Sequence, residues 1–361
     1  MFQVFFIVYY NIYRTGGHIT MNTNDYKKIL NSPEYEFLKT NEHLGDNIIL
    51  LALGGSHAYG TNTPTSDLDI RGIAIEKPEN LIGYQNFEQV INEATDTTIY
   101  AFNKIIHLLT DANPNIIEIL GLEEDQYLYM TPLGRELIAN KDLFLSQKIF
   151  YTFGGYAKAN LKRLENALAR DNYPEDRKNE HIAQSLENAI ADFNSKHDSE
   201  ICTSFASVKD GKLVYNVNLK DFPAEDFEQF YATVSNTNRN YRELLNRNRK
   251  KDDAHLNKHA MHLVRLYLMC IEMLNTGVIR TKRVEDHDLL MDIRNGKYMG
   301  EDGNMTPAFY TMISELETRC KEALEHTSLP KKPRVKEIEK FVMEVNKKII
   351  NGEYSTNKFT I

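Results

Sequence analysis

The stretch from residue 51 to residue 75, LALGGSHAYGTNTPTSDLDIRGIAI, constrains the fold more than any other part of the chain. An apolar run leads into two glycines and Ser56, and a short polar passage separates these from a second apolar run that carries Asp67 and Asp69. Because successive side chains of a strand point to opposite faces, we expect both aspartates on one face and their apolar neighbours in the core. Two adjacent carboxylates repel each other unless a cation lies between them, and hard divalent cations, Mg²⁺ above all, suit such oxygen ligands.

The two glycines before Ser56 predict a phosphate-binding turn. Gly54 and Gly55 lack a Cβ, so the backbone there can turn sharply and approach a ligand closely. The amides of Gly55 and Ser56, together with the Ser56 hydroxyl, are then placed to hold a phosphate at the start of a short helix. A phosphate cradle and a metal-binding acid pair on adjacent strands make up a phosphoryl-transfer site.

The order Gly-Ser, spacer, Asp-hydrophobic-Asp-hydrophobic resembles the signature of the DNA-polymerase-β-like nucleotidyltransferases. More narrowly, GSHAYGTNTPTSDLDIRG resembles the predicted nucleotidyltransferases assigned to RNA-repair pathways, and NPNIIEIL, KHAMHLVRL and IRNGKY are similar to the same family. These patches are spread over residues 47–300. The fold we expect is α+β: a small mixed β-sheet nucleotidyltransferase domain, the polymerase-β-like palm, followed by a mostly α-helical domain with a β-hairpin insertion.

The resemblance implies a metal-dependent enzyme that transfers a nucleoside monophosphate from an NTP such as ATP to a hydroxyl acceptor and releases pyrophosphate. Asp67, Asp69 and a third acid would ligate two Mg²⁺ ions, with Mn²⁺ as a substitute. Asp96, at the head of the predicted strand 97–100, is our choice for the third acid, and Glu93 is the alternative. Asp96 departs from the family pattern in having threonines on both sides. The implied acceptor is an RNA 3′ end, for example that of a broken tRNA.

The helix predicted around KHAMHLVRL carries a second set of candidate ligands. His255, His259 and His262 fall at positions i, i+4 and i+7, and Lys258 and Arg265 lie close to the same face. The family resemblance suggests that Lys258, His262 and Arg265 face the cleft and contact the triphosphate or the acceptor. One alternative is a zinc site, because histidines at i and i+4 can share that ion. The other is a solvated basic face on a helix whose opposite side is core.

Another cluster of positive charge follows this helix, and its members are Arg280, Lys282, Arg283, Arg294 and Lys297. On an acidic chain such a cluster is a candidate ligand face, but acids that can form salt bridges lie among its members. Both interpretations stay open. Arg249 and His255 also resemble, loosely, the Arg-spacer-His arrangement of HEPN-type ribonucleases.

Composition limits the partners. The formal net charge of -8 argues against an extended grip on duplex DNA, which requires a basic face, although a nucleotide or an RNA end can bind in a local basic cleft. Three scattered cysteines without a CxxC fit a cytoplasmic protein, and no stretch approaches the ~20 apolar residues that span a membrane. A small molecule or a protein side chain remains an alternative acceptor. Outside the enzymes, the alternative is a non-catalytic nucleotide-binding or nucleotide-sensing module.

A chain of 361 residues is expected to divide into two domains. In order, we expect a translated leader or disordered segment over 1–20, a catalytic domain over 21–140, a helical domain over 141–351 with a β-hairpin over 203–219, and a tail over 352–361. The leader is expected because Gly16 and Gly17 can encode a ribosome-binding sequence shortly before Met21. The predicted strands are 47–53, 67–75 and 97–100, and the predicted long helices are 147–170, 179–195, 224–247, 254–276, 307–326 and 335–350.

Overall fold

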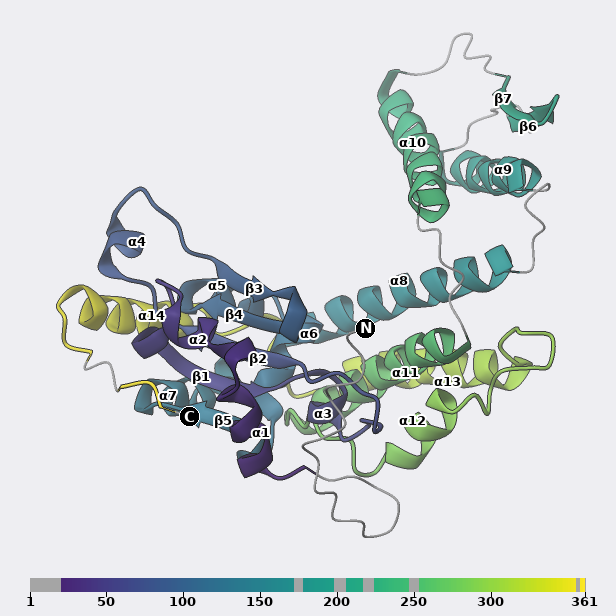
Figure 1. Ribbon diagram of the computed structural model, residues 1–361. Helices are drawn as coiled ribbons and strands as arrows, with labels where there is room; N and C mark the ends of the chain where they lie inside the picture. Colours follow the sequence, from purple (N-terminus) through teal and green to yellow (C-terminus); the bar gives the residue numbers. More distant parts are fainter. Residues whose placement is uncertain are drawn as a thin grey trace. The chain divides into compact units, whose positions relative to one another are not determined.

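The computed structural model describes residues 21–171, 178–197, 206–216, 224–246, 253–354 and 358–360 (Figure 1). The chain forms two compact units, Met1–Leu161 with Asn257–Ile361, and Lys162–Leu256. The predicted leader, Arg249, both ends of the predicted hairpin segment and part of the predicted tail lie outside the described residues. Within the described part of the chain, no helix has both the length and the apolar character needed to cross a membrane.

A five-stranded mixed sheet forms the centre of the first unit, with the strand order β3-β4-β2-β1-β5. Its strands are β1 (Ile48–Leu53), β2 (Ile70–Ala74), β3 (Gln89–Asn92), β4 (Thr97–Ala101) and β5 (Tyr127–Met130). The pair β2/β4 is parallel and the other pairs are antiparallel. Every residue of β1 is buried, as expected for an apolar strand with a neighbour on each side and a covered face on each side. The predicted mixed-sheet fold is confirmed.

The second strand begins later than the sequence suggested. It starts at Ile70, so Asp67 and Asp69 precede it, in a segment without regular secondary structure. The polar passage before them forms a turn in which the Thr63 amide donates to Ser66 Oγ at 2.8 Å. This turn delays the start of regular pairing, which the apolar pattern alone did not show.

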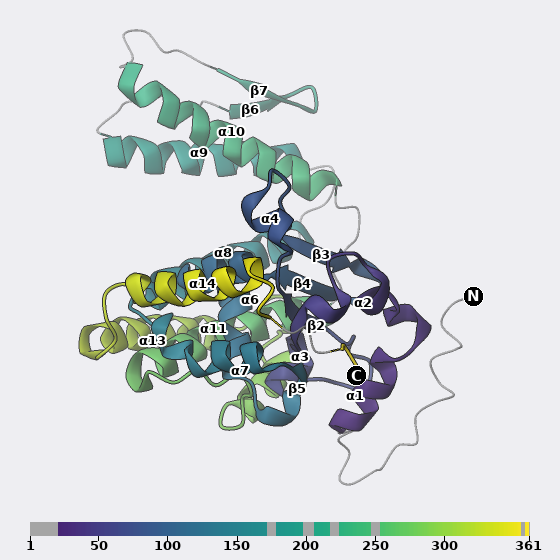
Figure 2. The ribbon, with the colours of Figure 1, turned by 90° about the vertical axis from the view of Figure 1, so that its left-hand side faces the viewer.

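The two faces of the sheet are covered by different helices. On one face, α1 (Thr23–Leu30) and α2 (Phe37–Thr40) contribute Leu30 and Leu38 to a core that includes Ile70 and Ile99. Figure 2 shows these two helices on one side of the strands and α11 (Asp253–Thr276) and α14 (Val335–Ile350) on the other. The functional side chains described below lie at the end of the sheet where β2 and β4 begin.

The remaining helices of the first unit are α3 (Gly55–Tyr59), α4 (Pro78–Ile82), α5 (Phe102–Thr110), α6 (Pro114–Ile117), α7 (Pro132–Ala139), α12 (His287–Arg294) and α13 (Pro307–His326). The helix α8 (Lys148–Asp171), like α11, continues from one unit into the other. The short 3₁₀ segments η4 (Glu93–Thr95) and η5 (Glu118–Gly121) matter for the site. At α7 the Thr131 hydroxyl accepts from the Gly134 amide and Pro132 occupies the first turn, as the Thr-Pro sequence predicts.

The second unit contains a helix pair and a hairpin. The helices α9 (Lys178–His197) and α10 (Ala224–Asn246) pack together, and the strands β6 (Ala206–Lys209) and β7 (Lys212–Tyr215) pair antiparallel. Asp210 and Gly211 both have positive φ, 51° and 71°, as a two-residue hairpin turn of this type requires. The predicted β-hairpin is therefore confirmed.

Candidate active site

The glycine turn and the second aspartate are in direct contact. The Gly54 amide donates to the Asp69 carbonyl at 2.8 Å, which continues the pairing of β1 with β2. Gly55 has φ +54°, and a Cβ added there would lie 1.9 Å from Asp69 Oδ2. Glycine is required at residue 55 both by its left-handed backbone and because the carboxylate occupies the space of a side chain. Ser56, which follows, is buried in α3.

The parallel pairing of β2 with β4 brings the third candidate acid next to the second. Ile70 is opposite Thr97, and the Ile70 amide donates to the Asp96 carbonyl at 3.2 Å. Asp69 and Asp96 therefore precede paired residues at the same end of the sheet. Asp96 has φ 45°, a left-handed conformation that aspartate tolerates better than most residues, and its side chain is exposed. Glu93 lies earlier, in η4.

The electrostatics of Asp69 show that the three predicted acids share one neighbourhood. Burial raises the pKa of its carboxyl, Arg71 opposes that rise, and the negative charges of Asp96 and Asp67 add to it. Lys258 also acts on this carboxyl and favours its ionised form. Three carboxylates and two cations therefore lie in this neighbourhood, which leaves a formal excess of one negative charge.

The acids are not assembled into a closed cage. Among the residues that the structure describes, no three His, Cys, Asp or Glu side chains are grouped closely enough to hold a metal ion. The same finding gives no support to a zinc site on the described histidines of α11. Mg²⁺, however, is usually held by one or two carboxylates together with substrate phosphates and water, rather than by a complete protein shell.

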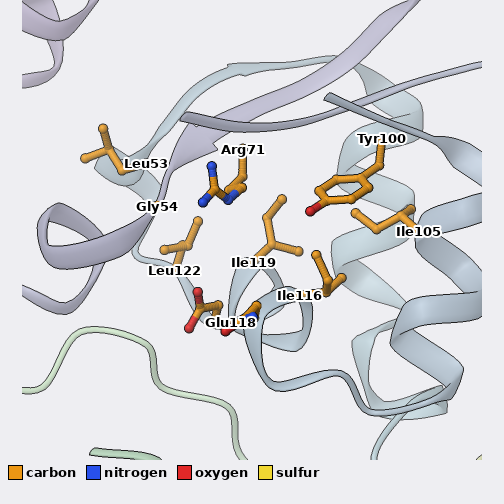
Figure 3. Close-up of a pocket in the computed structure, with 10 residues that line it drawn as sticks. Leu53, Gly54, Arg71, Tyr100, Ile105, Ile116, Glu118, Ile119 and Leu122 are labelled. Atoms are coloured by element: carbon orange, nitrogen blue, oxygen red, sulfur yellow. The ribbon is translucent and has the colours of Figure 1, made fainter. Parts of the chain in front are cut away.

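Arg71 links two of the acids. Its Nη2 lies 3.5 Å from Asp69 Oδ1, and its Nη1 donates to the Asp96 carbonyl at 3.0 Å. Arg71 also lines a small pocket on this face of the sheet, where its guanidinium and the Tyr100 ring lie opposite Glu118 (Figure 3). The residues around the pocket are Leu53, Gly54, Arg71, Tyr100, Ile105, Asn115, Ile116, Glu118, Ile119 and Leu122.

The three predicted ligands on α11 lie at different depths. Lys258 is exposed, His262 is half-buried, and Arg265 is only 3% exposed. Burial lowers the pKa of His262 well below its usual value, and the charges of Arg265 and Lys258 lower it further, so this imidazole is neutral near pH 7. Of the three, the structure brings Lys258 into the electrostatic surroundings of Asp69.

Arg265 belongs to a buried cluster together with Tyr59 and Glu118. The Tyr59 hydroxyl lies 2.8 and 2.7 Å from the two carboxylate oxygens of Glu118, and Arg265 Nη1 donates to one of them at 3.3 Å. The Arg265 guanidinium carbon also lies 3.7 Å from the centre of the Tyr59 ring, a cation–π contact. The Arg265 guanidinium therefore interacts with Glu118 and Tyr59 inside the protein.

Salt bridges account for much of the second basic cluster. Arg280 and Arg283 both pair with Glu272, Arg283 also pairs with Asp286, Lys282 pairs with Glu123, and Lys297 pairs with Asp292. Arg294 instead donates to the Thr61 carbonyl at 2.7 Å and to Ser66 Oγ at 3.1 Å. It thereby fixes the loop that leads to Asp67.

Sequence reasoning did not assign roles to Arg71, Tyr59 and Glu118. Arg71 and Tyr59 stand inside the motif GSHAYGTNTPTSDLDIRG, and Glu118 stands inside NPNIIEIL. A signal was present for the buried pair: Glu118 is a lone acid in one apolar run and Arg265 a lone base in another, and isolated charges at such positions are expected to pair.

Part of the chain matches a known protein family. Residues 31–180 match the model of a family described as the RNA repair pathway DNA polymerase beta family. The matched segment contains the five strands, the glycine turn, all three candidate acids and Glu118, whereas α11 lies beyond it. A comparison with curated proteins found no match.

Proposed function

We propose that this chain is a polymerase-β-like nucleotidyltransferase of an RNA-repair family, on the premise of the family match over residues 31–180. In this proposal it transfers a nucleoside monophosphate from an NTP to the 3′ hydroxyl of an RNA. The arrangement of the acids carries this proposal. Asp69 and Asp96 precede paired residues of two parallel strands, and Asp67 lies two residues before Asp69. Burial raises the pKa of Asp69, and the charges of Asp96 and Asp67 add to that rise. A partly buried carboxylate with two further carboxylates acting on it is suited to a cationic ligand.

We assign the divalent cations to Asp67, Asp69 and Asp96. The donor set fits, because it consists of carboxylates in excess over the neighbouring cations and it lies beside the Gly55 turn. When bound, Mg²⁺ or Mn²⁺ would neutralise charge on the phosphates and favour ionisation of the attacking hydroxyl.

The protein's own residues then have distinct tasks. Asp96, the exposed acid that directly precedes β4, orients the acceptor hydroxyl toward the α-phosphorus. Lys258 lies on α11, and its charge acts on Asp69. It neutralises charge on the triphosphate, while the Gly55 turn and Ser56 hold the outgoing phosphates. His262 is neutral near pH 7 and packs against the Tyr59 ring, so it adds no positive charge to the site.

An RNA acceptor is supported by the family description and by the chemistry of a hydroxyl-directed site. The net charge of -8 implies that the RNA is held locally, near its end, rather than along an extended duplex. Binding should then weaken only modestly as salt rises, because few phosphates are contacted.

One experiment tests this function directly. The full chain is incubated with each α-labelled NTP, Mg²⁺ or Mn²⁺, and total cellular RNA. The labelled products are then separated by size into RNA, protein and small molecules. We expect label in RNA that is lost when the RNA 3′ ends are oxidised with periodate beforehand, and no label from γ-labelled NTP. Label in the protein or in a small molecule would identify a different acceptor. No transfer from any NTP would refute the proposal, with the Asp69→Asn variant as the blank.

A further inference from the structure

The buried cluster of Tyr59, Glu118 and Arg265 joins three segments that are far apart in the sequence. Tyr59 ends α3, the helix that starts at the phosphate turn; Glu118 begins η5; and Arg265 lies in the middle of α11. All three side chains are nearly inaccessible, with exposures of 3%, 8% and 3%. A buried ion pair adds little stability compared with apolar packing, so its retention suits a role in fixing one arrangement of the surrounding elements.

We infer that Tyr59, Glu118 and Arg265 are positioning residues that set the register of α11 against α3 and thereby place Lys258 over the phosphate turn. This inference rests on the proposed function, since it assumes that Lys258 binds the triphosphate.

The geometry of α11 supplies the connection. Lys258, His262 and Arg265 are spaced i, i+4 and i+7 and share one face of the helix. At about 1.5 Å per residue, Lys258 lies about 10 Å along the axis from Arg265. His262, between them, contacts the edge of the Tyr59 ring, with ring centroids 6.3 Å apart and planes at 80°. Two residues on this face of α11, Arg265 and His262, therefore contact the Tyr59 ring on successive turns, and Lys258 lies on the next turn toward the site.

Hydrogen bonds also fix the end of α3, which carries Tyr59. The Tyr59 carbonyl accepts from the Arg283 amide at 2.9 Å, and Gln126 Nε2 donates to the Ala58 carbonyl at 2.9 Å. The end of α3 is thus fixed by backbone contacts, and Glu118 transmits that position to α11 through its carboxylate. A slip of α11 by one residue would separate Arg265 from both the ring and the carboxylate.

The test measures binding of a non-hydrolysable NTP analogue, with Mg²⁺, to the full chain. Glu118→Gln and Tyr59→Phe are each made in the wild-type background and in a Lys258→Ala background. We expect each to weaken binding by about tenfold in the wild-type background and by less than about twofold when Lys258 is absent, because an effect transmitted through Lys258 disappears with it. Tyr59→Phe keeps the ring under Arg265, so it serves if Glu118→Gln fails to fold.

Tyr267→Phe is the matched control. Tyr267 is also on α11 and buried, and its hydroxyl donates to a glutamate, Glu317, at 2.7 Å, but toward α13. Tyr267→Phe should leave nucleotide binding unchanged both in the wild-type background and in the Lys258→Ala background. Equal weakening by Tyr59→Phe with and without Lys258 would overturn the positioning role and leave the proposed function standing. Unchanged binding in Lys258→Ala alone would refute the role of Lys258, and the inference with it.

Discussion

Arg71 Nη2 lies 3.5 Å from Asp69 Oδ1, two residues along the same segment and on the same face of the sheet. Arg71 thus forms an ion pair with an acid that we assign to metal binding. It also donates to the carbonyl of Asp96, so one guanidinium contacts both sides of the candidate site. In the free enzyme it offsets part of the charge that a divalent cation would neutralise.

Arg71→Met should therefore increase the affinity of the nucleotide-free protein for Mn²⁺. Removing a positive charge beside Asp69 removes roughly 1 kcal/mol of repulsion, which corresponds to about fivefold tighter binding. Electron paramagnetic resonance of free Mn²⁺ measures this directly. Lys148→Met, which removes a lysine that pairs with Asp111 instead, should leave the affinity unchanged. Weaker Mn²⁺ binding by Arg71→Met would contradict the assignment.

Asp69→Asn should abolish nucleotidyl transfer, by about a thousandfold or more, because one metal ligand is worth several kcal/mol in the transition state. The protein should remain folded, as judged by circular dichroism. If transfer stays near the wild-type rate, Asp69 is not the central ligand.

The same variant should be more stable than wild type at neutral pH. The folded-state pKa of Asp69 is raised, chiefly by burial, so the ionised form opposes folding, and this penalty is complete above the folded-state pKa. As the pH falls toward the carboxyl's ordinary value of 3.8, the penalty disappears. We expect a higher melting temperature for Asp69→Asn at pH 7, and a difference that shrinks as the pH falls toward 3.8. A lower melting temperature at pH 7 would mean that Asp69 stabilises the fold as an anion.

Gly55→Ala should cost far more activity than Gly60→Ala. Both glycines have positive φ, +54° and +73°, so alanine at either strains the backbone by about 1–2 kcal/mol. Only at residue 55 does the new Cβ collide with Asp69 Oδ2; at residue 60 its nearest neighbour is Lys282 Cγ at 3.5 Å. We expect the two variants to have similar melting temperatures and Gly55→Ala to have a kcat at least about a hundredfold below that of Gly60→Ala. That result would show that the new Cβ displaces Asp69. Equal activities would exclude it.

Asp96→Asn and Glu93→Gln separate the two candidates for the third acid. Asp96 acts on the pKa of Asp69 and its carbonyl accepts from the Ile70 amide, whereas Glu93 lies earlier, in η4. We expect at least about a hundredfold loss of kcat for Asp96→Asn and a change of less than about twofold for Glu93→Gln, measured as pyrophosphate release. The reverse ranking would move the third ligand to η4.

Much of the sheet could be predicted from the apolar pattern. The run that precedes Gly54 is buried at every position, and the strand predicted over 97–100 is β4. The strand β5 was not predicted, because Tyr127–Met130 is short and depends on pairing with β1 for its existence. Four residues are too few to show a clear alternation of apolar and polar side chains.

The candidate site shows a similar division. Order and spacing along the chain sufficed to select Gly55, Asp67 and Asp69 as candidates. Helical spacing also identified the shared face of Lys258 and Arg265, but it could not show that this face runs from solvent into the core. Depth depends on how α11 packs against Tyr59 and Glu118, and one-dimensional periodicity contains no information about that contact.

The parallel pairing of β2 with β4 has a consequence for how this chain can vary. Because Asp69 and Asp96 each lead into one of these strands, their proximity depends on the paired rows and not on the number of residues between them. The intervening excursion, with α4 and the edge strand β3, can therefore be shortened or extended without displacing either carboxylate. Insertions and deletions between positions 77 and 86 should therefore leave catalysis intact, because the buried side chains of Glu76 and Phe87 at the two ends of this segment are kept.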